Sequence, residues 1–562
     1  MDRTSGLRAA AVALLLSLGV TGCGDDPEGE DNPGEGQSGA SDPPGDGASD
    51  AGAPADGPRV ELATGVVQGE QLEGAVRFLA IPYARPPVAE LRFAAPQPAE
   101  PWEGVRAETD FVPGCPQQED QGAPASDNED CLYLNVWTPD PMPDGAPVMV
   151  WIHGGGNFSG ATGIPVPTTD TLWYDGRIFA ERQGVVLVTI QYRLGPLGFN
   201  PHPSLADEGA PLGNQGLHDQ RLALEWVRDN ITSFGGDAGN VTIFGESAGS
   251  ANVCYHVASP GSRGLFHRAI GQSGGCTIRS VGPEQRADAV GDRMVAYGEA
   301  VGCPAGDDQL ACMREVPVTT ILEHAMQPMP GGGETSEDSF RFAAVVDGEG
   351  GFLPDDLRTL FDAGEIADVP YLLGANHDEG TTLVWRASPI TTEEEYLADL
   401  EVRYGDAAGE IAELYPASEF GGDYNAARAR VVGDSGLVCG THDTARRFAA
   451  AGRAVFMYNF NVHWSIAPEL FLAGHAAEIS HVFGTPHLPE PDAESAAVAD
   501  AMNTYWARFA ATGDPNGSDA PAEWPSFAMD GDRRLQLAPE WQVLEDFRAE
   551  ECAFWRRYHG VE

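Results

Sequence analysis

Short apolar runs bounded by turn residues recur along most of the chain. Four of them are residues 148–152, 185–190, 241–244 and 369–373. Stretches with helical patterning alternate with these runs, for example residues 219–230 and 495–511. A strand buried on both faces has no polar side, so it reads as a continuous apolar run of about five residues. The pattern therefore predicts an α/β fold, with a central, mostly parallel β-sheet flanked by helices.

The first 23 residues have the pattern of a targeting segment. Arg3 and Arg8 precede a mostly apolar stretch at residues 9–20, which is too short to span a bilayer. The stretch ends in Val20-Thr21-Gly22-Cys23, which resembles a bacterial lipobox, where the cysteine becomes the lipidated first residue of the mature protein. We therefore expect export from a bacterial cytoplasm, with the lipid on Cys23 as the only attachment to a membrane.

Residues 24–58 differ in composition from everything that follows. They are almost entirely Gly, Pro, Ser, Ala, Asn, Asp and Glu, with no aromatic and no basic residue. Such a segment cannot bury enough apolar surface to fold, so it predicts a disordered acidic linker. Because no second linker interrupts residues 59–562, we expect them to form a single large domain.

The charge balance is strongly acidic. The 562 residues include 85 Asp and Glu but only 33 basic residues, all of them arginine, so the formal net charge is −52 at pH 7. Binding to nucleic acid or to anionic lipid head groups needs clustered cations. We therefore expect no nucleic-acid partner, while the oligomeric state is not indicated by the sequence.

The chain has nine cysteines. If Cys23 carries a lipid, eight remain, and an even number in an exported chain predicts disulfide bonds. Eight cysteines permit 105 pairings, and their spacing alone selects none of them. No two cysteines have the Cys-x-x-Cys spacing of a zinc or redox site. These features indicate a protein that is lipid-anchored in the cell envelope or secreted, and no metal site is expected.

One motif in the middle of the chain fits a nucleophilic serine. Gly245-Glu246-Ser247-Ala248-Gly249 matches Gly-x-Ser-x-Gly, in which a tight turn between a strand and a helix exposes the hydroxyl. A second match surrounds Ser273. Ser247 follows the strand-like run 241–244 and precedes residues 248–257, which can form a helix, whereas no helix is predicted after Ser273. The context therefore favours Ser247.

A glycine-rich turn follows the first of the apolar runs. Residues 148–152 lead into His153-Gly154-Gly155-Gly156, where bare backbone can direct N–H groups at one point. Beside the serine, the N–H groups of Gly155, Gly156 and Ala248 could bind the oxyanion that forms on a carbonyl under attack.

A serine nucleophile needs a histidine base, which a carboxylate must orient. The run 369–373 leads to Asp378 and Glu379, and either carboxylate could serve. His475 lies in a loop after the strand-like residues 454–460. Four other histidines remain as alternatives on spacing alone: His442, His463, His481 and His487.

Three segments carry a resemblance to a known family. They are Ile81-Pro82-Tyr83-Ala84-x-Pro86-Pro87 with Leu91-Arg92-Phe93, the cysteine-containing stretch from Glu129 to Trp137, and the stretch from Phe234 to Gly249 around the serine. Together they resemble the type-B carboxylesterase and cholinesterase family of α/β-hydrolases, over nearly all of residues 59–562. The resemblance implies the α/β-hydrolase fold in a single catalytic domain.

The same resemblance assigns roles that the residues alone leave open. It implies that Glu379 is the acid and His475 the base of a triad with Ser247. It also implies disulfides between Cys115 and Cys131, Cys303 and Cys312, and Cys439 and Cys552. Cys254 and Cys276 then remain, and we predict that they pair.

The implied activity is hydrolysis of small carboxylic esters through an acyl-enzyme, with no metal or organic cofactor. In cholinesterases, the loop between the first two cysteines carries a tryptophan that faces the choline cation. Here residues 115–131 contain none, which argues against a choline-specific site. The alternatives are a non-catalytic surface binding or adhesion module on the same fold, and a lipase for longer acyl chains.

Overall fold

The computed structural model describes residues 57–561, except residues 121, 167–168, 170, 279–283, 326–341, 486–491, 519 and 530. Pro58–Glu562 cluster as one compact unit. The predicted leader at residues 1–23, with Cys23, lies outside the described residues, as does nearly all of the predicted linker at 24–58. Within the described part, no helix is both long enough and apolar enough to cross a membrane.

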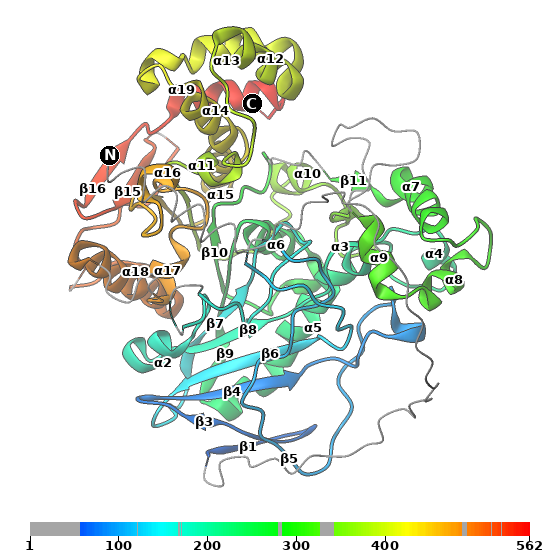
Figure 1. The fold of residues 1–562 in the computed structure, drawn as a ribbon. Coiled ribbons are helices and arrows are strands. Elements are labelled where there is room, and N and C mark those ends of the chain that lie inside the picture. Colours follow the sequence, from blue (N-terminus) through cyan, green and yellow to red (C-terminus); the bar gives the residue numbers. More distant parts are fainter. Residues whose placement is uncertain are drawn as a thin grey trace, which may run out of the picture. The chain divides into compact units, whose positions relative to one another are not determined.

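A twisted sheet forms the centre of the described unit (Figure 1). Among the described residues it has eleven strands, which are, in spatial order, β16 (Gln542–Glu545), β15 (Arg533–Leu537), β14 (Val455–Phe460), β13 (Tyr371–Asn376), β10 (Arg268–Gln272), β9 (Gly236–Glu246), β7 (Ala146–Ile152), β8 (Val186–Ile190), β6 (Tyr133–Pro139), β4 (Ala75–Pro82) and β3 (Glu70–Gln71). The seven from β15 to β8 pair in parallel, and the strands at the two ends pair antiparallel. The prediction of a mostly parallel sheet is therefore confirmed.

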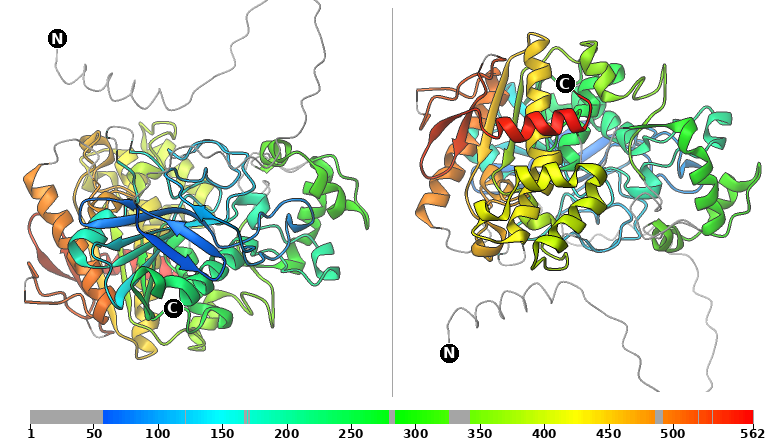
Figure 2. Two further views of the ribbon diagram at one scale, coloured as in Figure 1. Left: turned by 90° about the horizontal axis from the view of Figure 1, so that it is seen from below. Right: turned by 90° about the horizontal axis from the view of Figure 1, so that it is seen from above.

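The central strands are buried on both faces, as their apolar runs predict. In β7, Val148, Val150 and Ile152 belong to one buried cluster, while Met149 and Trp151 belong to another on the opposite face. The first cluster includes side chains of α5 (Gln215–Asn230) and α6 (Ala248–Ala258). The second includes side chains of α2 (Arg177–Gln183), α17 (Ile479–Phe483) and α18 (Ala493–Thr512). Figure 2 shows helices on both sides of the sheet. Neither face of these strands is left for solvent.

The helices lie close to where their patterns predict them. Residues 219–230 form part of α5 (Gln215–Asn230), and residues 495–511 form most of α18 (Ala493–Thr512). The other described helices are α2 (Arg177–Gln183), α3 (Gly195–Gly198), α4 (Ser204–Asp207), α6 (Ala248–Ala258), α7 (Ala287–Ala300), α8 (Gln309–Glu315), α9 (Val318–Ala325), α10 (Leu357–Asp362), α11 (Gly380–Leu383), α12 (Glu393–Tyr404), α13 (Ala408–Leu414), α14 (Tyr424–Gly433), α15 (Cys439–Ala450), α16 (Pro468–Phe471), α17 (Ile479–Phe483) and α19 (Ala549–Tyr558). Two minor sheets join β1 (Arg59–Leu62), β2 (Gly65–Gln68) and β5 (Val105–Arg106), and β11 (Gln285–Arg286) with β12 (Val345–Val346).

A separate apolar cluster holds the helices drawn in yellow and red at the top of Figure 1. It contains residues of α12, α13, α14 and α19, including Tyr396, Ile411, Val431 and Trp555. Between α14 and α15 the chain makes a π-helical turn, Asp434–Val438. Helix α14 of this cluster also contacts the turn that carries Glu379, in the candidate site described below.

The described residues contain four disulfides, and they join the same pairs that the sequence analysis expects. These are Cys115–Cys131, Cys254–Cys276, Cys303–Cys312 and Cys439–Cys552. Disulfides are typical of proteins from oxidising compartments outside the cytoplasm.

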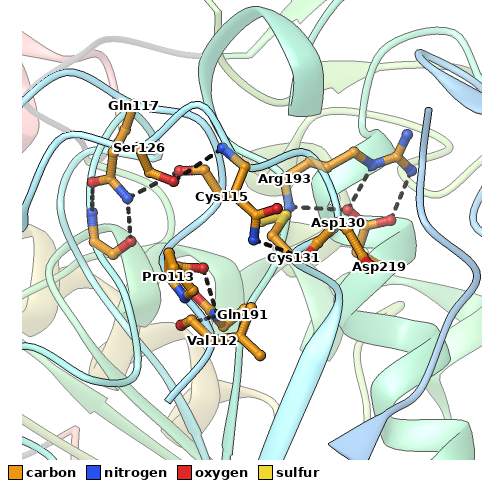
Figure 3. The surroundings of a disulfide bond; sticks show 12 residues. Val112, Pro113, Cys115, Gln117, Ser126, Asp130, Cys131, Gln191, Arg193 and Asp219 are labelled. Carbon is orange, nitrogen blue, oxygen red and sulfur yellow. Dashed lines mark hydrogen bonds and ion pairs between the residues drawn. A yellow bond between two sulfur atoms is a disulfide. The ribbon is translucent and has the colours of Figure 1, made fainter. Parts of the chain in front are cut away.

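The loop closed by Cys115 and Cys131 is fixed to the segment that follows the glycine-rich turn (Figure 3). Inside the loop, the Gln117 side chain accepts a hydrogen bond from the Gly160 N–H at 2.7 Å and donates one to the Gly160 carbonyl at 2.8 Å. A Cβ on Gly160 would lie 2.2 Å from the His153 ring. The first disulfide thereby supports the strand end that carries the glycines.

Removing the Cys439–Cys552 disulfide will cost more stability than removing Cys303–Cys312. The first closes a loop of 113 residues and the second a loop of 9 residues. Loop entropy predicts that the free energy of unfolding falls by about 5 kcal/mol without Cys439–Cys552 and by about 3 kcal/mol without Cys303–Cys312. Urea unfolding of the double variants Cys439→Ser/Cys552→Ser and Cys303→Ser/Cys312→Ser measures the difference, and an equal or reversed order would contradict the prediction.

Candidate active site

Ser247 occupies a sharp turn between a strand and a helix. β9 ends at Glu246 and α6 begins at Ala248, and Ser247 between them has φ 57° and ψ −121°. This is a strained conformation for a residue with a side chain. The Ser247 N–H donates a hydrogen bond to the Gln272 carbonyl at 2.9 Å, which ties the turn to the end of β10.

The two glycines of the motif allow this turn to pack. A Cβ on Gly249 would lie 2.1 Å from the carbonyl oxygen of Ile152, and one on Gly245 would lie 2.6 Å from the backbone of Gly249. Both contacts are with backbone atoms, which cannot move aside as a side chain can. The pattern Gly-x-Ser-x-Gly is therefore needed for the close approach of α6 to β7.

The second serine match has a different environment. Ser273 also has positive φ, 55°, and its N–H donates to the Gly374 carbonyl at 2.8 Å. No helix follows it in residues 274–278, the described part of the next segment. Ser273 is fully buried, whereas Ser247 is partly exposed. Of the two, Ser247 is the one that a substrate can reach.

The glycine-rich turn after β7 packs directly on Ser247. A Cβ on Gly154 would lie 3.1 Å from the Ser247 Cβ and 2.7 Å from the Glu246 carbonyl oxygen. Gly155 and Gly156 follow with φ of 94° and 65°, values that favour glycine. Ala248 is the first residue of α6, where backbone N–H groups have no partner within the helix. The three candidate oxyanion donors thus belong to two segments that meet at Ser247.

The structure brings Glu379 and His475 together. The His475 Nδ1 lies 2.7 Å from the Glu379 Oε2, and the His475 backbone N–H donates to the Glu379 carbonyl at 3.2 Å. The Asn376 N–H donates to the Glu379 Oε1 at 2.7 Å. Asp378 points elsewhere, with its Oδ1 2.9 Å from the Arg430 Nη2. Of the two carboxylates that the sequence leaves open, only Glu379 contacts the histidine within the described residues.

The other candidate histidines are engaged away from Glu379 or lie at the surface. The His442 Nε2 lies 3.3 Å from the Asp532 Oδ2, and the His481 Nε2 lies 2.9 Å from the Ser495 Oγ. His463 is exposed. His487 lies outside the described residues.

The other ring nitrogen of His475 points toward the turn that carries Ser247. Its Nε2 lies 3.2 Å from the Oε1 of Glu246, the residue before the serine. Among the hydrogen bonds of the described residues, none joins the Ser247 hydroxyl to His475. Hydrogen bonds at catalytic sites are often long without substrate and shorten when it binds.

Glu246 is a carboxyl group with an unusual environment. Burial raises its pKa to about 8, against the opposing effect of His475. Burial alone would lower the pKa of His475, but the carboxylates of Glu246 and Glu379 outweigh it and raise the pKa above the usual range. A proton on Glu246 removes one of the charges that hold a proton on His475, so the two groups titrate as a pair.

Glu246→Gln should therefore move the acid limb of the pH profile to lower pH. A general base accepts a proton only when it is neutral, so His475 as the candidate base must be neutral for activity, and loss of the Glu246 charge lowers the pKa of the histidine. We expect a shift of up to about one pH unit, measured as kcat/KM for a neutral ester between pH 4 and 9. Because Glu246 is charged mainly above its pKa of about 8, the shift requires a limb near or above that pH, and an unmoved limb there would contradict the coupling of Glu246 to His475.

A buried hydrogen-bond network surrounds the triad candidates, and sequence reasoning does not identify it. The Glu478 carboxylate accepts from the Gln272 side chain at 3.1 Å and from the Asn376 side chain at 2.6 Å. Asn376 also donates to the Gly474 carbonyl at 2.8 Å, next to His475. Gln272 and Asn376 end the parallel strands β10 and β13. Polar residues at the carboxyl ends of such strands are a signal that could have found them.

No group of three or more His, Cys, Asp or Glu side chains in the described part of the chain is arranged to hold a metal ion. The chemistry available at the carboxyl ends of β7, β9, β13 and β14 is that of a hydroxyl, an imidazole, carboxylates and backbone N–H groups. This set suits attack on a carbonyl carbon.

The model of the carboxylesterase family matches residues 56–555. The chain is 34% identical over 547 residues to an acetylcholinesterase of Bungarus fasciatus, covering 89% of this chain and 86% of that protein. It is also 34% identical over 516 residues to a cholinesterase of Mus musculus, covering 86% of this chain and 83% of that protein. The chain therefore belongs to the carboxylesterase family and is a serine hydrolase of carboxylic esters.

Proposed function

We propose that this chain is an exported esterase that works through an acyl-enzyme, with Ser247 as nucleophile, His475 as general base and Glu379 as the orienting acid. The observation that carries the proposal is the 2.7 Å contact between His475 and Glu379, on loops beside the strained turn of Ser247. Export is supported by the predicted leader and by the disulfides. A lipid on Cys23 would be the attachment to the membrane.

The proposed reaction begins when His475 removes the proton from the Ser247 hydroxyl as its oxygen attacks the ester carbonyl. The N–H groups of Gly155, Gly156 and Ala248 bind the oxyanion, at about 3 kcal/mol for each donor. His475 then protonates the departing alcohol, leaving the acyl group on Ser247. Water attacks this ester by the same route and releases the acid. Glu379 stabilises the imidazolium in both halves of the reaction.

The proposed substrates are small carboxylic esters. The relatives named above are cholinesterases, but the disulfide loop from Cys115 to Cys131 is short here, with a sequence separation of 16, and contains no tryptophan. We therefore propose esters of neutral alcohols in preference to choline esters.

Labelling with a fluorophosphonate probe tests the proposal on the disulfide-intact protein, with mapping of the modified peptide and assay of short p-nitrophenyl esters alongside. An adduct on Ser247 together with ester turnover is the expected result. A folded protein that forms no adduct would point to a non-catalytic binding module. Turnover that rises steeply with acyl length would point to a lipase.

A further inference from the structure

Arg430 and Asp378 form an ion pair next to the proposed acid. The Arg430 Nη2 lies 2.9 Å from the Asp378 Oδ1, and only 14% and 11% of the two side chains are exposed. Asp378 directly precedes Glu379 in the chain. The Asp378 Oδ1 also lies 3.0 Å from the His377 Nδ1, and the Arg430 guanidinium lies 5.7 Å from the centre of the Phe420 ring. Burial would raise the pKa of Asp378, but His377 and Arg430 lower it, so the carboxylate is ionised at neutral pH.

The helix that carries Arg430 touches the Glu379 turn through its backbone. A Cβ on Gly380 would lie 1.8 Å from the Ala429 carbonyl oxygen, and one on Gly433 would lie 2.9 Å from the Glu379 Cβ. α14 therefore packs directly on the turn that carries Glu379, with no side chain between the two backbones. A displacement of α14 is transmitted directly to Glu379.

On its other side, the turn that carries Glu379 is hydrogen-bonded to the loop that carries His475. The Asp378 N–H donates to the Ala473 carbonyl at 3.0 Å, and the Thr381 hydroxyl donates to the Phe471 carbonyl at 2.5 Å. Asp378 thus connects α14 to the loop that carries His475. Its side chain binds Arg430 of α14, and its backbone N–H binds the loop.

We propose that Arg430 is a positioning residue. It acts through Asp378 to keep the Glu379 carboxylate at hydrogen-bonding distance from the His475 ring. The inference rests on the proposed function. A charged pair in a site of low exposure is directional and strong when both partners are present. A displacement of about 1 Å at a catalytic group can lower a rate about 100-fold. The ion pair between Arg430 and Asp378 can therefore affect turnover without contacting the substrate.

The test compares Arg430→Met with Arg430→Lys and with the matched control Arg92→Met. Arg92 forms a similar ion pair with Glu129, with 9% and 14% of the side chains exposed, and no hydrogen bond or ion pair joins it to Glu379 or His475 within the described residues. We expect Arg430→Met to lower kcat 10- to 100-fold, with KM changed less than about two-fold. Arg430→Lys keeps the charge and should recover a large part of kcat. Arg92→Met should lower the unfolding temperature and leave kcat near that of the wild type.

The pH profile separates positioning from a loss of stability. A displaced Glu379 raises the pKa of His475 less, so the acid limb for Arg430→Met should lie at lower pH than for the wild type. Wild-type kcat and an unmoved limb in Arg430→Met, with a stability loss like that of Arg92→Met, would overturn the proposal. If Arg430→Met does not fold, the variant Asp378→Asn tests the proposal in its place. Asp378→Asn should lower kcat and move the acid limb to lower pH. A wild-type kcat with an unmoved acid limb would overturn the proposal. Failure of the wild type to form an adduct on Ser247 would instead reject the proposed function.

Discussion

Ser247→Ala is expected to lower kcat for short esters by on the order of 10⁵-fold while the protein stays folded. The substitution removes the only atom that can form the acyl-enzyme in the proposed reaction. The oxyanion donors remain, so a residual rate above that of water alone is expected. Hydrolysis of p-nitrophenyl esters measures the loss, and thermal unfolding checks that the variant is folded.

Ser273→Ala is the matched control, because Ser273 lies in the other Gly-x-Ser-x-Gly match and is fully buried. It should keep a kcat within about ten-fold of the wild type. If Ser247→Ala retained its ester hydrolysis, or if Ser273→Ala abolished it, the assignment of the nucleophile would be wrong.

Glu379→Gln is expected to lower kcat by about 10⁴-fold with little effect on folding. The glutamine side chain has nearly the same shape, but its amide can donate to the His475 Nδ1. Donation to Nδ1 places the imidazole proton on Nε2, where the base must be free to accept the proton of Ser247. Single-turnover acylation with a p-nitrophenyl ester measures the step directly.

Asp378→Asn gives the comparison within the same loop, since either carboxylate satisfies the sequence pattern. Its loss of kcat should stay within the 10- to 100-fold range expected for positioning. A larger effect from Asp378→Asn than from Glu379→Gln would exchange the roles of the two carboxylates.

The sheet and the serine turn could be predicted because local patterns determine them. An apolar run of about five residues identifies a strand buried on both faces, and residues 148–152 and 241–244 both lie in central strands. The exact bounds could not be predicted: β9 begins at Gly236, five residues before its apolar run. Residues 236–240 are polar or small, so the apolar pattern does not reveal them. Gly236 pairs with Ala146 of β7, and the Asn240 side chain donates a hydrogen bond to the Ala511 carbonyl.

The choice between Asp378 and Glu379 shows where local pattern ends. A local contact acts on one carboxylate, because the Asn376 N–H donates to the Glu379 Oε1. A contact between distant segments helps to decide which carboxylate meets His475, since Arg430, 52 residues away, binds Asp378. The same holds for Glu246 and Glu478, whose burial depends on the whole sheet. From the residues alone these two carboxyl groups look like ordinary surface acids.

The separation of the site along the chain has a consequence for synthesis. Ser247 is translated more than two hundred residues before His475, which takes on the order of ten seconds or more at ~5–20 residues per second. During that interval the nascent chain contains the segment of Ser247 but neither His475 nor its loop. Because β13 and β14 must also join the sheet before Glu379 and His475 can meet, the proposed mechanism predicts that the ribosome-bound polypeptide is inert toward esters. Hydrolysis would then begin only when almost the entire domain has been made.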